Sequence, residues 1–154
     1  MLPNKSIIIF KFYLDIFKLL SNKKNFCFKV IIFWKGGKKV NVKKVFSDEL
    51  PSCYAVNRIQ KDDKDYLMVA SEVENSCFAY DVNDNFSKKV VWDTVGGTMS
   101  IIQVPDTLDF LATQKFYPGF NSKECQIVYG KYKDEKWEVK KIADFPYLHR
   151  FDLI

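Results

Sequence analysis

A pattern of two lysines before a β-branched residue occurs three times in this chain, and it limits the folds available to the chain. The copies are VKKV (42–45), SKKV (87–90) and VKKI (139–142). Around each copy the sequence reads as a strand, a turn and a second strand that carries the lysine pair. The spacing gives a repeat of about 45–50 residues, which has room for four short strands.

Short segments with the composition of β-strands follow one another after residue 26. The aromatic content of 16% and the many Val and Ile residues favour strands over helices. Gly, Pro, Asn and Asp separate the segments, as they do in tight turns. The predicted strands are 27–34, 39–46, 53–59, 66–73, 76–82, 88–94, 98–104, 109–117, 125–132, 137–143 and 148–154. The sequence therefore predicts an all-β fold built of antiparallel hairpins.

Four strands in a repeat of this length are typical of a β-propeller blade. The chain resembles the poorly characterised bacterial β-propellers with FG-GAP-like or TolB-like repeats, and this resemblance rests on periodicity over residues 26–154. Trp92-Asp93 resembles the WD40 dipeptide, but it occurs once and lacks its Gly-His partner. The resemblance implies a partial β-propeller of about two and a half four-stranded blades. The predicted blades are about 26–50, 52–95 and 98–145, with the start of the next at 148–154.

Residues 1–25 match no blade and are predicted to be an apolar helix and a basic linker. Lys11, Asp15, Lys18 and Asn22 recur at helical spacing and form one polar stripe, which predicts a helix over 7–20. Interrupting charges leave no apolar stretch near the roughly 20 residues of a membrane span, so no span is expected. An incomplete propeller leaves apolar sheet faces open. This helix could cover one face, subunits could associate through the open faces, or the chain could be a truncated reading frame, which the sequence favours.

Polar residues at equivalent positions of the inner strands form the candidate ligand site. Alignment of 52–57, 98–103 and 147–152 makes Tyr54, Ser100 and His149 equivalent, with Asp152 in a second ring. Imidazole is a common general base and metal ligand, and the adjacent Arg150 could hold a carboxylate or phosphate. The simpler interpretation is that His149 and Tyr54 pack between blades.

A second candidate is a weak metal loop at the turn after residue 80. Asp81, Asn83 and Asn85 reproduce the opening of a calcium-binding loop, but Phe86 replaces its glycine and Trp92 its final glutamate. An Asn/Asp-rich hairpin turn explains the same letters. We therefore expect no metal and no cofactor.

Cysteine and lysine usage bears on compartment and partners. Cys27, Cys53, Cys77 and Cys125 form no close pair, which favours buried thiols in a reducing compartment and a cytoplasmic location. The lysines lack a recognised nucleic-acid-binding fold, so no nucleic-acid partner is expected.

The sequence has no phosphate-binding glycine loop, no Ser-His-Asp order and no zinc-protease motif. It therefore predicts a binding or scaffolding propeller fragment without a self-contained catalytic motif. The alternative is part of a propeller lyase or hydrolase that acts on a sugar or small acid, with His149 and Arg150 in the central channel.

Overall fold

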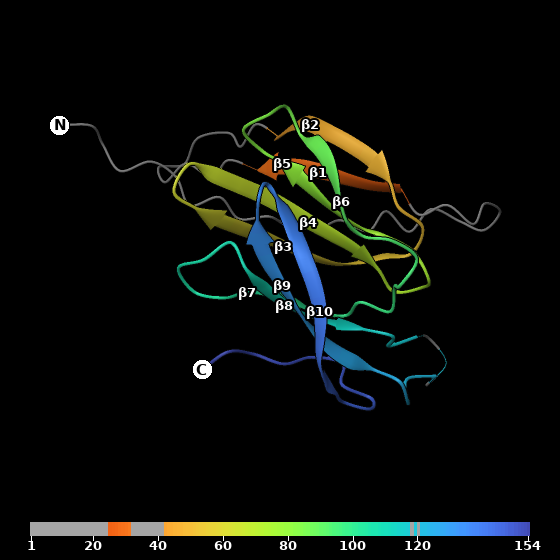
Figure 1. The fold of residues 1–154 in the computed structure, drawn as a ribbon. Coiled ribbons are helices and arrows are strands. Elements are labelled where there is room, and N and C mark those ends of the chain that lie inside the picture. Colours follow the sequence, from red (N-terminus) through yellow and green to blue (C-terminus); the bar gives the residue numbers. More distant parts are fainter. Residues whose placement is uncertain (1–24, 32–41, 118, 120) are drawn as a thin grey trace. The chain divides into compact units, whose positions relative to one another are not determined.

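The computed structural model describes residues 25–31, 42–117, 119 and 121–154, and in this part of the chain it is all-β (Figure 1). The chain divides into two units, residues 1–49 and residues 50–154. The predicted antiparallel all-β fold is confirmed for the described residues. The helix predicted over 7–20 lies outside them. Within the described ranges, no helix is long and apolar enough to cross a membrane.

The first unit contains one antiparallel pair of strands. β1 (Asn25–Ile31) pairs with β2 (Val42–Glu49), and the register shifts between Phe28 and Lys29. The first copy of the lysine pattern thus lies in β2.

The second unit contains two four-stranded antiparallel sheets, and in each the strands follow one another in chain order. The first sheet consists of β3 (Cys53–Lys61), β4 (Lys64–Ser71), β5 (Cys77–Asp81) and β6 (Ser87–Trp92). The second consists of β7 (Ile101–Gln103), β8 (Phe110–Gln114), β9 (Gln126–Lys133) and β10 (Lys136–Asp144). These strands lie within or close to predicted segments, because side-chain alternation and turn residues are local signals.

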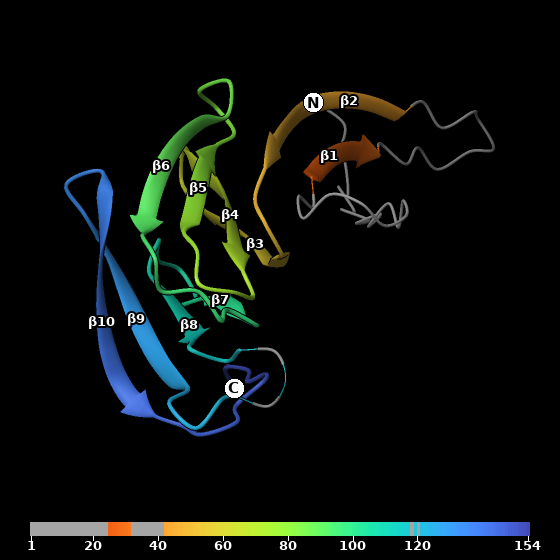
Figure 2. The ribbon, with the colours of Figure 1, turned by 90° about the vertical axis from the view of Figure 1, so that its right-hand side faces the viewer.

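The two sheets pack face to face and enclose the apolar core (Figure 2). β3 lies against β7, and β6 lies against β10. Asn57 Nδ2 donates to the Ile101 carbonyl at 2.8 Å, and the Gln60 backbone bonds to the Gln103 side chain. From Asn57 to Gln60 on β3, the contact on β7 moves forward from Ile101 to Gln103. β3 and β7 therefore run in the same direction. The largest fully buried side chains of this core include Tyr66, Met68, Phe110 and Val128.

The second and third copies of the lysine pattern lie on β6 and β10, each of which is an edge strand of its sheet. The β-branched residue of the pattern is exposed in every copy: Val45 by 44%, Val90 by 61% and Ile142 by 56%. Lysines beside such residues deter pairing with another sheet edge. The β-branched residue after each lysine pair therefore lies outside the core, whereas Val139, the first residue of the third copy, packs against it.

The strand predicted over 148–154 is wrong, because these residues have no regular secondary structure. The preceding segment turns back instead: the Tyr147 amide donates to the Ser122 carbonyl at 3.0 Å, and the Leu148 amide to the Phe145 carbonyl at 3.2 Å. Alternation of side chains fits a strand here, but a strand also needs a neighbour for its backbone groups.

Candidate functional site

Tyr54 and His149, which are 95 residues apart in sequence, are in contact. The Tyr54 hydroxyl lies 3.4 Å from His149 Nε2, and the ring centroids are 6.0 Å apart at 90°. The Phe116 ring lies 5.1 Å from the imidazole at 85°. Tyr54 is 43% exposed, and His149 is exposed as well. The three side chains form an aromatic cluster that solvent can reach.

Phe116 was not a predicted site residue, because its segment was expected to continue as a strand to 117. β8 ends at Gln114, and Lys115 takes a φ of 61°, which redirects the chain. The Phe116 amide donates to the Gly97 carbonyl at 3.0 Å. A Cβ on Gly97 would lie 2.5 Å from the Phe116 nitrogen, so the approach requires glycine. The GG pair at 96–97 was the available signal, but it indicated only a turn.

The remaining predicted site residues are not joined to His149 by any described contact. The Ser100 backbone is held by Thr113, since its amide donates to Thr113 Oγ1 at 3.2 Å and its carbonyl accepts from the Thr113 amide at 3.0 Å. Asp152 accepts a hydrogen bond from the Leu153 amide at 2.8 Å. Arg150 is exposed. The aromatic cluster thus offers an imidazole and stacking surfaces, with a guanidinium next to them in the chain.

The Asn/Asp-rich segment forms the turn between β5 and β6. Asp81 Oδ1 accepts from the Asn83 amide at 3.0 Å, and Asn83 Nδ2 donates to the Asp63 carbonyl at 2.7 Å. Asn85 takes a φ of 47°. Among the described residues, no three acidic, His or Cys side chains gather to hold a metal ion. The side chains of Asp81 and Asn83 satisfy backbone groups of the turns.

An ionic network joins the two sheets at the β9–β10 turn. Glu135 forms ion pairs with Lys64 at 2.8 Å and Lys89 at 3.5 Å, and it accepts from the Tyr132 hydroxyl at 3.1 Å. The Tyr132 and Tyr66 hydroxyls are 2.8 Å apart. The hydrogen bond with Lys64 lowers the pKa of Glu135 and raises the pKa of Lys64. Burial, followed by the bond to Tyr66, raises the pKa of Tyr132. The network therefore links β4 and β6 of the first sheet to the β9–β10 turn of the second.

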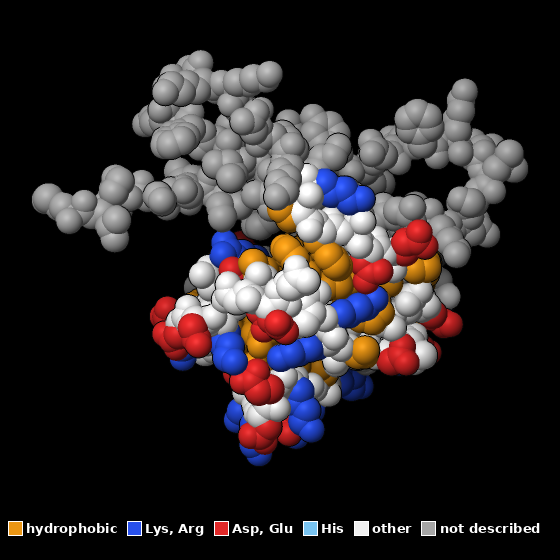
Figure 3. Space-filling model, turned by 90° about the horizontal axis from the view of Figure 1, so that it is seen from above, with side chains coloured by type: hydrophobic (Ala, Val, Ile, Leu, Met, Phe, Trp, Pro, Cys, Tyr) orange, Lys and Arg blue, Asp and Glu red, His pale blue; other side chains and the backbone are white. Residues whose placement is uncertain are grey.

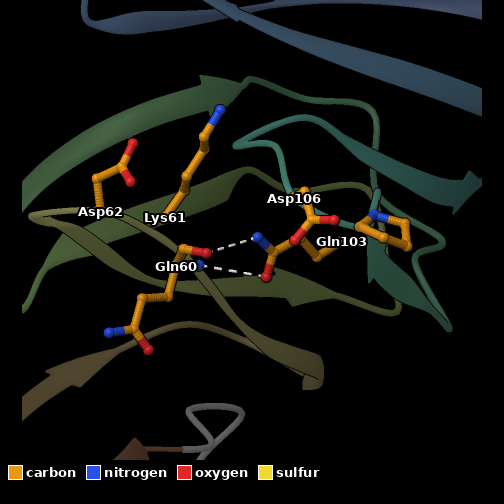
Figure 4. Close-up of a pocket in the computed structure, with 6 residues that line it drawn as sticks. Gln60, Lys61, Asp62, Gln103 and Asp106 are labelled. Atoms are coloured by element: carbon orange, nitrogen blue, oxygen red, sulfur yellow. Dashed lines mark hydrogen bonds between the residues drawn. The ribbon is translucent and has the colours of Figure 1, made fainter.

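A hollow of about 510 Å3 lies between the β3–β4 and β7–β8 turns (Figure 4). Its lining residues come from the two sheets and are Gln60, Lys61, Asp62, Gln103, Pro105 and Asp106. In sequence these turns were recognised only by their KDDKD and PD segments. The hollow lies near the end of β3, whereas Tyr54 lies near its start.

The described surface mixes charges of both signs. On the face seen in Figure 3, lysine and arginine side chains are interspersed with aspartate and glutamate, and no extended area of one sign is visible. This face of the described residues thus lacks the basic patch typical of nucleic-acid-binding proteins.

Comparisons of the chain with protein families, with curated proteins and with solved structures found no match.

Proposed function

We propose that the two sheets of residues 50–154 are successive blades of a β-propeller with FG-GAP-like or TolB-like repeats. Both sheets have chain-order topology, and the first strand of one lies against the first strand of the next. The last strands of the two sheets, β6 and β10, also lie against each other. β3 and β7 run in the same direction. Blades arranged around an axis have this relation. An experimental structure in which the two sheets meet with their strands in reversed order would contradict the proposal.

The function that this arrangement supports best is a binding or scaffolding module without catalysis. The contact between Tyr54 and His149 carries the proposal, because it places a hydrogen-bonding imidazole on an exposed aromatic surface. Arg150 follows directly in the chain and supplies a planar donor group for a carboxylate or phosphate. The ligand class is therefore a small anion with a planar or apolar part.

The single histidine provides a specific test, since its imidazole signals in an NMR spectrum can have only one source. Benzoate and phenyl phosphate should shift these signals, and Arg150→Gln should abolish the shift. Lys136→Gln removes an equally exposed charge on β10 and should leave the shift unchanged. If neither anion shifts the His149 signals of the wild-type chain, the proposed site is wrong.

The scaffolding part of the proposal rests on the outer face of the second sheet. Ile102, Leu111 and Tyr129 face one another across β7, β8 and β9, and all three are half-buried. Since Phe110 and Ala112 point into the core, Leu111 points to the opposite face. We expect the chain to self-associate through this row. Light scattering should show oligomers that Leu111→Lys disperses and Val90→Lys leaves intact.

The alternative function is part of a propeller lyase or hydrolase acting on a sugar or small acid. This alternative predicts measurable turnover of such a substrate, and the substitution His149→Ala should abolish that turnover. The aromatic contacts of His149 favour binding, because no described carboxylate orients the imidazole as a general base.

A cytoplasmic location remains part of the proposal. Cys77 and Cys125 are buried, and burial raises the pKa of both thiols, which makes them unreactive. Buried thiols are typical of proteins in a reducing compartment, whereas Cys53 is only half-buried.

A further inference from the structure

We propose that the hollow between the β3–β4 and β7–β8 turns binds a small zwitterion that carries an amine and a carboxylate. This site is separate from the Tyr54–His149 cluster, because the two lie near opposite ends of β3. Its volume of about 510 Å3 has room for a molecule of a few heavy atoms, and the hollow is open to solvent.

The wall of the hollow is held in place before any ligand arrives. Gln103 Nε2 donates to the Gln60 carbonyl at 2.8 Å and to the Thr107 carbonyl at 2.6 Å. Gln103 Oε1 accepts from the Gln60 amide at 3.2 Å. The Gln103 side chain of the second sheet thus fixes both turns. Figure 4 shows that the side chain of Gln60, whose backbone groups form these bonds, points away from Gln103. Such preorganisation reduces the ordering cost of binding.

The charged groups of the hollow are not used by the fold. Lys61, Asp62 and Asp106 are exposed, and none forms an ion pair or side-chain hydrogen bond in the described part of the chain. Lys64, only three residues after Lys61, is by contrast paired with Glu135 at 2.8 Å. In Figure 4, Lys61 and Asp62 rise from one turn and Asp106 lies at the other. Charges from two sheets therefore border one space and remain available to a ligand.

The pattern of charge decides the ligand class. One ammonium and two carboxylates leave the hollow with a net charge of −1, so an anion alone or a neutral apolar molecule is not complementary to it. A simple amine would use the carboxylates but would face the Lys61 ammonium. A zwitterion matches groups of both signs, with its carboxylate toward Lys61 and its amine toward Asp106 on the facing turn.

Three molecules of similar length test this class on the full chain. γ-Aminobutyrate carries both charges, n-butylamine only the amine, and butyrate only the carboxylate. Backbone amide shifts of residues 60–62, 103, 104 and 106 should saturate at the lowest concentration with γ-aminobutyrate. Equal midpoints for γ-aminobutyrate and n-butylamine, or no shift with γ-aminobutyrate, would overturn the proposal.

Substitutions that keep the turns intact locate the site. Asp62 and Asp106 have φ angles of 52° and 57°, a conformation that asparagine tolerates equally well. Asp106→Asn should therefore stay folded and weaken γ-aminobutyrate binding about tenfold, as the loss of a charge-assisted hydrogen bond implies. Asp84→Asn makes the same charge change on the exposed β5–β6 turn and should have no effect. Equal affinities of these two variants would show that the hollow is not the binding site.

Discussion

At the scale of single residues, the packing of the core requires glycine, which has no side chain, at position 130. Gly130 on β9 lies opposite Phe110 on β8, and a Cβ on Gly130 would lie 2.2 Å from two atoms of the phenyl ring. The ring occupies the space that any other residue at 130 would need. Phe110 in turn is fully buried, where it contacts the rings of Trp92 and Trp137. Glycine is therefore required here by packing.

Gly130→Ala should lower the free energy of unfolding by about 1–3 kcal/mol, because the added methyl overpacks the core. In a Phe110→Leu background the same change should cost less, since the smaller side chain vacates the space. A coupling of about 0.5–3 kcal/mol is typical of residues in contact. Urea unfolding of the four variants measures it. An equal cost in both backgrounds would mean that the ring can move aside.

At the scale of elements, one face of the edge strand β6 is exposed to solvent and the other is buried. Val90 is 61% exposed, whereas its neighbour Val91 is 7% exposed. Val90→Thr should change stability by less than about 0.5 kcal/mol, because surface positions are tolerant. Val91→Thr buries a hydroxyl and should cost about 1–3 kcal/mol. Thermal unfolding of the two variants compares them directly, and similar melting temperatures would contradict the assigned faces.

The β9–β10 turn should make the contact between the sheets sensitive to pH. The pKa of Glu135 is lowered in the folded chain, so its ion pairs stabilise the fold above the ordinary glutamate range. This contribution disappears as the pH falls through the folded pKa. The raised pKa of Lys64 keeps the pair intact at neutral pH and up to the ordinary lysine range. Exposed pairs contribute little individually, but here three partners share one carboxylate.

Glu135→Gln should therefore lower the urea midpoint at pH 7, and the difference from wild type should shrink at pH 3. Glu138→Gln removes an exposed carboxylate of β10 that forms no described ion pair, and it should have little effect at either pH. A Glu135→Gln deficit that is the same at both pH values would exclude an ionic origin.

At the scale of the whole molecule, local signals predicted the strands better than the contacts between them. β3 to β10 follow from alternation and turn residues, and two copies of the lysine pattern lie on the edge strands β6 and β10. Lys64 and Glu135 are 71 residues apart, so no local signal could have paired them. Phe116 was missed because the φ of Lys115 depends on its neighbours. The strand over 148–154 failed because alternation says nothing about whether an edge is available to pair with it.

Residues 50–154 should fold without the first 49 residues. The main core cluster lies entirely between Ala55 and Val139, and it includes the rings of Trp92, Phe110 and Trp137. A separately expressed chain of residues 50–154 should unfold in one urea transition, with a free energy of about 5–15 kcal/mol. Near-ultraviolet circular dichroism should report ordered packing of Trp92 and Trp137. Phe110→Ala in the same chain should remove about 3–5 kcal/mol of that stability. A gradual transition with strong binding of a hydrophobic dye would contradict independent folding of residues 50–154.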